Sequence, residues 1–182
     1  MKCMSRIGQF ALLSEYNRLM NQRQMEAAAL LPPEHLSRDT GAFFDSILGT
    51  LNHIMVGDIV WLKRFASHPN SYPSLQYLRE RERPTTLDQI LHTELDALEE
   101  ERQKLDGIII DWCKELKEPE LDTALTYRNM MGKTFTKNLG DLILHLFLHQ
   151  THHRGQVTTL LCQHGVDFGD TDLLEIIPNL PT

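Results

Sequence analysis

Residues 144–156 read Leu-His-Leu-Phe-Leu-His-Gln-Thr-His-His-Arg-Gly-Gln. Apolar residues and histidines recur here every three or four positions, which is the spacing of an amphipathic helix. Asn138 is a suitable N-cap before this stretch, and Gly165 supplies a stop after it. The sequence therefore predicts a helix of about 26 residues, about 39 Å long, that begins after Asn138 and ends at His164.

Three segments upstream show the same helical spacing of apolar residues, over about residues 7–30, 41–66 and 85–117. Pro32-Pro33 ends the first segment, and Pro69 follows the second. The third opens at Thr85 or Thr86, where a threonine followed by Asp88 resembles a capping box. Four amphipathic helices of this length predict an all-α fold, a four-helix bundle.

The remaining segments differ in character from the helices. Residues 123–137 carry short strand-like spacing around Gly132, which predicts a small hairpin between the third and fourth helices. Residues 69–85 hold prolines and alternating charges and are interpreted as a solvated connection, and the tail 166–182 as a strap on the surface. With no repeat or composition shift, we expect a single domain over residues 1–182.

Charge and cysteine content narrow the class of protein. The chain has 182 residues, 18 Lys plus Arg, 25 Asp plus Glu and a net charge of −7, which disfavours nucleic acid and anionic membranes as partners. Its three cysteines, at positions 3, 113 and 162, lie far apart and form no Cys-x-x-Cys pair. Together with the lack of a signal or membrane-spanning run, this predicts a reduced, cytoplasmic protein.

Histidines are the unusual feature: the chain has nine, and four of them fall within residues 145–153. His149 and His153 are four apart, so their rings lie one turn apart on the same helix face and could share a metal ion. A catalytic site needs a third ligand. We favour His53, because Gly49 and Gly57, one turn away on either side, leave room for a ring. Spacing alone leaves metal binding and ordinary helix packing equally open.

The residues around these histidines resemble the two signature stretches of the DinB (DinB/YfiT-like) family of metalloenzymes. The similar stretches are Leu-Asn-His-Ile-Met-Val-Gly-Asp around His53 and His-Gln-Thr-His-His-Arg-Gly-Gln at 149–156. The resemblance covers essentially the whole chain. It implies a four-helix bundle, commonly a homodimer, in which His53, His149 and His153 hold one divalent metal. His152 and residues 154–156 match the same stretch, and we assign them supporting roles, because a ligand ring usually needs a partner for its other nitrogen.

The resemblance does not fix one reaction. We expect a metal-dependent enzyme that activates a small thiol or water for attack on an electrophile, resembling a thiol S-transferase. The alternatives are a non-catalytic metal-binding, dimer-forming stress-response protein and a metal-dependent hydrolase. Imidazole ligands favour zinc or nickel, with iron and manganese also compatible. His145 is interpreted as a packed core histidine, and Arg128 could reach an anionic substrate. His35, His68 and His92 are expected to be solvated, and both tryptophans to be core aromatics.

Overall fold

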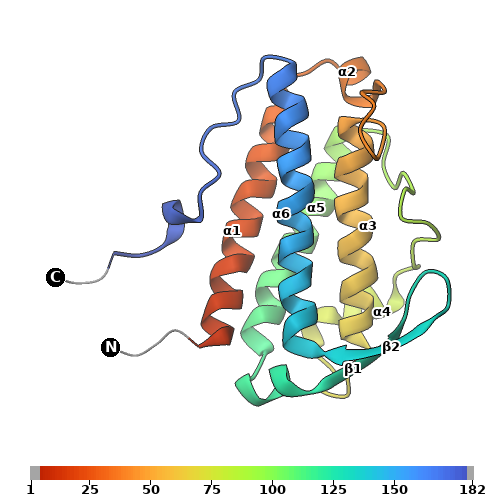
Figure 1. Ribbon diagram of the computed structural model, residues 1–182, viewed down its shortest axis with the longest axis vertical. Helices are drawn as coiled ribbons and strands as arrows, with labels where there is room; N and C mark the ends of the chain where they lie inside the picture. Colours follow the sequence, from red (N-terminus) through yellow and green to blue (C-terminus); the bar gives the residue numbers. More distant parts are fainter. Residues whose placement is uncertain (1–4, 180–182) are drawn as a thin grey trace.

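Four long helices lie side by side in the computed structural model, which describes residues 5–179 (Figure 1). They are α1 (Arg6–Ala28), α3 (Ile47–Ala66), α5 (Leu95–Glu115) and α6 (Leu139–Gln163). In Figure 1, α6 lies in front between α1 and α3, with α5 behind. The prediction of a mostly helical fold is confirmed. The described residues contain six α-helices rather than four, because α2 (Pro33–Ser37) and α4 (Gln76–Glu80) each add a short helix.

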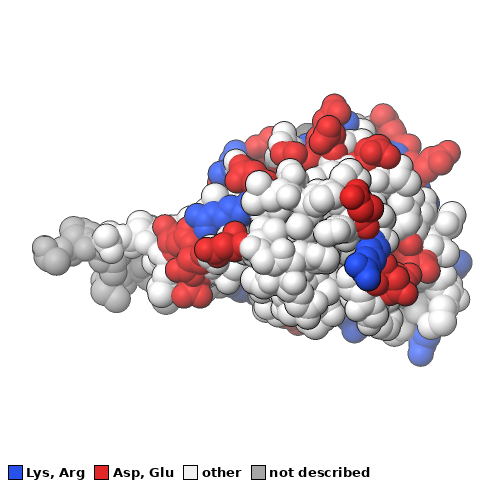
Figure 2. Space-filling view, turned by 90° about the horizontal axis from the view of Figure 1, so that it is seen from above, with Lys and Arg blue, Asp and Glu red and all other residues white. Residues whose placement is uncertain are grey.

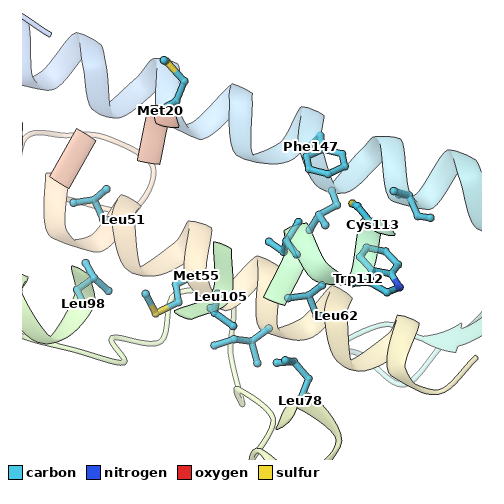
Figure 3. Packing of buried hydrophobic residues seen from close by; sticks show 14 of the residues in the cluster. Met20, Leu51, Met55, Leu62, Leu78, Leu98, Leu105, Trp112, Cys113 and Phe147 are labelled. Carbon is cyan, nitrogen blue, oxygen red and sulfur yellow. The ribbon is translucent and has the colours of Figure 1, made fainter. Parts of the chain in front are cut away.

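The four long helices bury their apolar stripes against one another. Figure 3 shows side chains from all four meeting in one core, with Met20 of α1, Met55 of α3, Leu105 of α5 and Phe147 of α6 among them. Trp112 of α5 is fully buried in this core, as predicted. Burial of apolar surface on this scale is the main source of the fold's stability.

Side-chain caps define where three of these helices begin. The side chains of Ser5, Ser46 and Asn138 accept a hydrogen bond from a backbone N–H of the first turn of α1, α3 and α6. Gly165 follows α6 with φ of +78°, a conformation that glycine adopts without strain. The predicted ends of the first and fourth helices are therefore correct to within two residues.

The predicted start of the second helix is wrong by six residues. Residues 41–46 form a bend in which Asp45 has φ of +63°, and α3 begins only at Ile47. The backbone carbonyl of Phe44 approaches Gly49 so closely that a Cβ atom there would lie 2.1 Å from its oxygen. The bend therefore depends on a glycine in the first turn of α3.

The predicted start of the third helix is also wrong, by about ten residues. The backbone N–H and hydroxyl of Thr85 bond the Gln89 side chain, and α5 begins only at Leu95. Residues 85–94 instead run along α3, where the buried side chain of Asn52 accepts from the backbone N–H groups of Leu91 and His92. A tertiary contact thus replaces the backbone bonds of a first helical turn.

The connection between α3 and α5 combines buried apolar residues with an exposed charged run. A 3-10 turn at Pro73–Leu75 leads into α4, and the side chains of Tyr72, Leu75 and Leu78 are buried in the core. The alternating charges of this segment predict exposure to solvent. Its apolar residues, however, lie on one side of the segment and pack against the core. The interpretation of residues 69–85 as a solvated connection is therefore correct for the charged residues 79–83, which are exposed or half-buried, and wrong for the buried apolar residues of the segment.

The predicted hairpin and tail are confirmed within the described residues. Strands β1 (Ala124–Arg128) and β2 (Thr134–Asn138) pair antiparallel, with Tyr127 opposite Phe135. A 3-10 turn at Glu118–Asp122 precedes β1, and another at Leu173–Ile176 lies in the tail. The tail lies against α1, where Arg23 pairs with Glu175. None of the helices in residues 5–179 is long and apolar enough to cross a membrane.

Candidate metal centre

Three histidine rings from two helices meet at one point. His53 lies on the second turn of α3, and His149 and His153 lie one turn apart on α6. The Nε2 atom of His53 is 3.2 Å from Nε2 of His149 and 3.2 Å from Nε2 of His153. One nitrogen from each ring lies within 4.8 Å of the other two. The structure thus brings together the three residues that the sequence predicted.

Hydrogen bonds at the far side of two rings fix which nitrogen is free to bind. Nδ1 of His53 lies 2.8 Å from the carbonyl oxygen of Leu87, and Nδ1 of His153 lies 2.7 Å from Oε1 of Gln156. Both partners only accept, so each Nδ1 carries the ring proton and each Nε2 presents a lone pair. Lone pairs that face one another at 3.2 Å repel unless a cation lies between them.

Burial keeps the rings in the form that binds metals. Burial lowers the pKa of His53 to about 4 and that of His149 to about 3, and it also lowers the pKa of His153. All three rings are therefore neutral near pH 7. Neutral imidazole is the form of histidine that coordinates a metal ion.

The donor set fits a divalent transition metal. Two nitrogens bound to a tetrahedral zinc ion at the usual bond length are about 3.3 Å apart, close to the separations found between these rings. Within residues 5–179 the group of potential ligands has three members, all of them histidines, with no cysteine or carboxylate among them. Three protein ligands are typical of a catalytic site that keeps one position for water or substrate.

An aromatic side chain from the bend before α3 covers one side of the triad. The Phe44 ring stacks on His53 with the ring centres 3.6 Å apart and 16° between the planes. Its edge also faces His153, at 5.6 Å. Phe44 therefore orients His53 and shields it from water. This role could not be predicted from the apolar spacing, which places Phe44 inside a regular helix.

Other histidines stand outside the triad. His152 is exposed and packs only its ring edge against His153. His145 is exposed too, with its ring 5.1 Å from that of Trp61, so its interpretation as a core histidine is wrong. His68 is buried and His92 pairs with Glu101, so neither is the solvated residue expected.

A buried polar network lies beside the triad and connects the four long helices. Asp58 of α3 pairs with Arg102 of α5, and the Gln150 amide of α6 donates to both carboxylate oxygens of Asp58 at 2.8 Å. Arg102 also pairs with Asp106, to which Asn21 of α1 donates at 2.9 Å. Polar residues on otherwise apolar helix faces are the sequence signal of this network, which was not among the predictions.

Sequence comparison agrees with this geometry. The family model described as the DinB family matches residues 4–178. The chain belongs to the DinB family. It is 25% identical over 160 residues to Protein DinB of Bacillus subtilis (strain 168), an alignment that covers 88% of each chain. No solved structure matches it at a significant level. For this DinB family member, both the family and the convergence of the three histidines are thus established.

Proposed function

We propose that this DinB family protein is a metal-dependent enzyme whose ion is held by His53, His149 and His153. The observation that carries the proposal is the convergence of three neutral imidazole nitrogens, two of them oriented by acceptors on their far side. In this proposal the chain acts as a single domain, and its four long helices form the four-helix bundle implied by the family.

Chemically, a divalent ion held by neutral ligands lowers the pKa of a bound water or thiol and so supplies a nucleophile near neutral pH. The chain's own residues prepare the site for that role. Leu87 and Gln156 hold the rings of His53 and His153 by accepting hydrogen bonds from their Nδ1–H groups, and Phe44 excludes water from one side. These contacts fix the ligand rings before substrate arrives.

The proposed reaction is transfer of a small thiol to an electrophile. The thiol loses its proton to solvent, its sulfur forms a bond to the electrophilic carbon, and the leaving group departs with its electron pair. Family resemblance supports a thiol over water as the nucleophile. The three-member ligand group favours catalysis over an ion that only braces α3 against α6, because structural zinc sites are normally closed by a fourth protein ligand.

The proposed substrate is a small molecule and not a nucleic acid or a membrane. The net charge of −7 supports this choice, and Figure 2 shows more acidic than basic side chains on the end of the molecule seen from above. A homodimer is also proposed, supported by two leucines, Leu144 and Leu148, that are exposed on α6. Light scattering on the purified protein tests the dimer.

Elemental analysis of tag-free protein tests the metal site. We expect about one equivalent of transition metal in the wild type and in His152→Ala, and loss of metal in His53→Ala and His149→Ala with helix content retained. His152→Ala is the matched control, since it removes a neighbouring exposed histidine from the same helix. A wild type that takes up no zinc, nickel, manganese or iron would contradict the proposal. Metal-loaded protein is then assayed with small thiols and an alkyl halide.

A further inference from the structure

A pocket lined by positive charge lies between the C-terminal half of α3 and the hairpin. Its volume is about 520 Å³, and its wall contains Lys63 and Arg64 from α3, Arg83 from the following connection, and Arg128 from β1. Thr126 and Thr134 supply hydroxyl groups to the same wall, and no acidic side chain lines it. The wall of the pocket thus carries four positive charges, although the net charge of the chain is −7.

Arg64 is the fixed element of this pocket. Its guanidinium carbon lies 4.3 Å from the ring centre of Trp61 and 4.6 Å from that of Tyr127, so two aromatic faces hold it. One terminal nitrogen donates to the carbonyl oxygen of Arg128 at 3.2 Å, while Nε is buried without a partner. The guanidinium is thus oriented, and Arg64 lines the pocket with a positive charge.

No counter-ion neutralises Arg64 in the described chain. No carboxylate in residues 5–179 lies within ion-pair distance of it, and burial together with the positive charge of Arg83 lowers its pKa to about 10. A half-buried charge with an unsatisfied donor is costly. An oxyanion that entered the pocket would offset this cost. Lys63 adds to the positive field, although its ammonium donates to the carbonyl oxygen of Leu78 at 2.6 Å.

The same face of α3 leads from the triad to this pocket. One face of α3 carries, in order, His53, Gly57, Trp61 and Arg64, because these residues are four, four and three positions apart. Across from them on α6, His149 packs on Gly57 and His145 packs on Trp61. Eleven residues of helix span about 16 Å, so Arg64 follows His53 by about this distance along α3.

We propose that this pocket is the anion-binding subsite of the metal centre, and that it holds the carboxylate or phosphate end of an elongated small molecule whose thiol or electrophilic group lies at the triad. The part concerning the triad rests on the proposed function, whereas anion binding in the pocket does not. Arg64 and Arg128 are the groups that contact the anion.

Calorimetric titration of the metal-free protein tests anion binding by itself. The probes are inorganic phosphate and succinate, which distinguish a phosphate from a carboxylate site. We expect binding in the wild type to weaken about tenfold in Arg64→Gln and in Arg128→Gln, as for loss of one hydrogen bond to a charged group. Arg128 is exposed on a strand, so its substitution leaves the core intact.

Arg18→Gln is the matched control for these titrations. It removes one positive charge from α1, where Arg18 pairs with Glu15, and it should leave the affinity unchanged. An equal loss of anion affinity in Arg18→Gln would show that the effect depends only on net charge, and it would contradict the proposed anion site. Absence of binding by both probes at millimolar concentration would overturn it as well.

Zinc-loaded protein tests the link between pocket and triad. The probes are ω-mercaptocarboxylates of increasing chain length, each compared with the neutral thiol of equal length. We expect long mercaptocarboxylates to bind more tightly than their neutral counterparts, and Arg64→Gln to abolish the difference. Equal affinity for charged and neutral thiols would show that the pocket and the metal centre do not bind the same molecule. Failure of every thiol to bind would count against the proposed function, while the phosphate titration would still decide on the pocket.

Discussion

At the scale of single residues, the ring of His149 is oriented by packing. Its Nδ1 atom is buried and has no partner in the described chain, unlike the same atom of His53 and of His153. Gly57 makes room for the ring: a Cβ atom there would lie 2.7 Å from Cε1 of His149. We predict that Gly57→Ala displaces the ring and lowers zinc affinity at least about tenfold, measured by competition with a chromophoric chelator.

Gly107→Ala provides the control for this prediction. Gly107 is exposed in the middle of α5, and a Cβ atom there would meet no atom within 4 Å. The substitution should leave zinc affinity unchanged and raise the free energy of unfolding by about 0.5–1 kcal/mol. If Gly57→Ala binds zinc as tightly as Gly107→Ala does, packing does not position His149.

His153, unlike His149, is oriented by a hydrogen bond, which it makes with Gln156. Oε1 of Gln156 accepts from Nδ1 of His153 at 2.7 Å. Gln156→Leu removes this acceptor, and we expect zinc affinity to fall about 10- to 100-fold, whereas Gln156→Glu keeps an acceptor and most of the affinity. The same competition titration measures both variants. An equal loss in both would mean that shape, rather than the acceptor, matters at this position.

At the scale of elements, the extended segment 85–94 connects the fold to the site. Asn52 of α3 is fully buried and binds this segment at Leu91 and His92, while the carbonyl of Leu87 in the same segment accepts from His53. We predict that Asn52→Ala lowers the free energy of unfolding by about 1–3 kcal/mol, because two partly buried N–H groups lose their acceptor.

Urea denaturation measures the cost of Asn52→Ala, and hydrogen exchange locates it. Faster exchange should be confined to residues 85–94 and the first turns of α5. Exchange that accelerates equally in α1 and α6 would show that Asn52 stabilises the whole molecule and not this segment.

The same segment shows why the starts of α1 and α6 were predicted correctly and the start of α5 was not. The starts of α1 and α6 are set by local caps, Ser5 and Asn138, which are visible in the sequence. The start of α5 is set by Asn52, which lies 40 residues away from His92 along the chain. A capping pattern at Thr85 cannot outweigh a buried side chain that binds the backbone from another helix.

At the scale of the whole molecule, the network around Asp58 and Arg102 holds the long helices in register. Both side chains are buried, and Arg102 neutralises both Asp58 and Asp106. We predict that Arg102→Met lowers the free energy of unfolding by about 3–5 kcal/mol near neutral pH, because it leaves two buried carboxylates without a positively charged partner. Urea denaturation followed by circular dichroism measures the loss.

The size of this loss should depend on pH. Burial raises the pKa of Asp58 from 3.8 to about 6, in spite of Arg102. The folded state then binds more protons than the unfolded state between these values, so this residue's contribution to stability falls as the pH rises from 3.8 to about 6. Without Arg102 the pKa of Asp58 rises further, so the pH range over which its contribution to stability falls extends to higher pH. The difference between wild type and variant should therefore be larger at about pH 7.5 than at about pH 5; a smaller difference at the higher pH would contradict this account.

The mostly helical class, the hairpin around Gly132 and the pairing of His149 with His153 can be predicted from the sequence, because each depends on residues close together in the chain. The glycines beside His53 indicate that residue as well. The contacts of Leu87 and Phe44 with His53, the neutralisation of Asp58 by Arg102, and the pocket in which Arg64 has no counter-ion among the described residues are visible in the folded molecule alone. These contacts join residues on different elements, and burial, rather than local spacing, sets their strength.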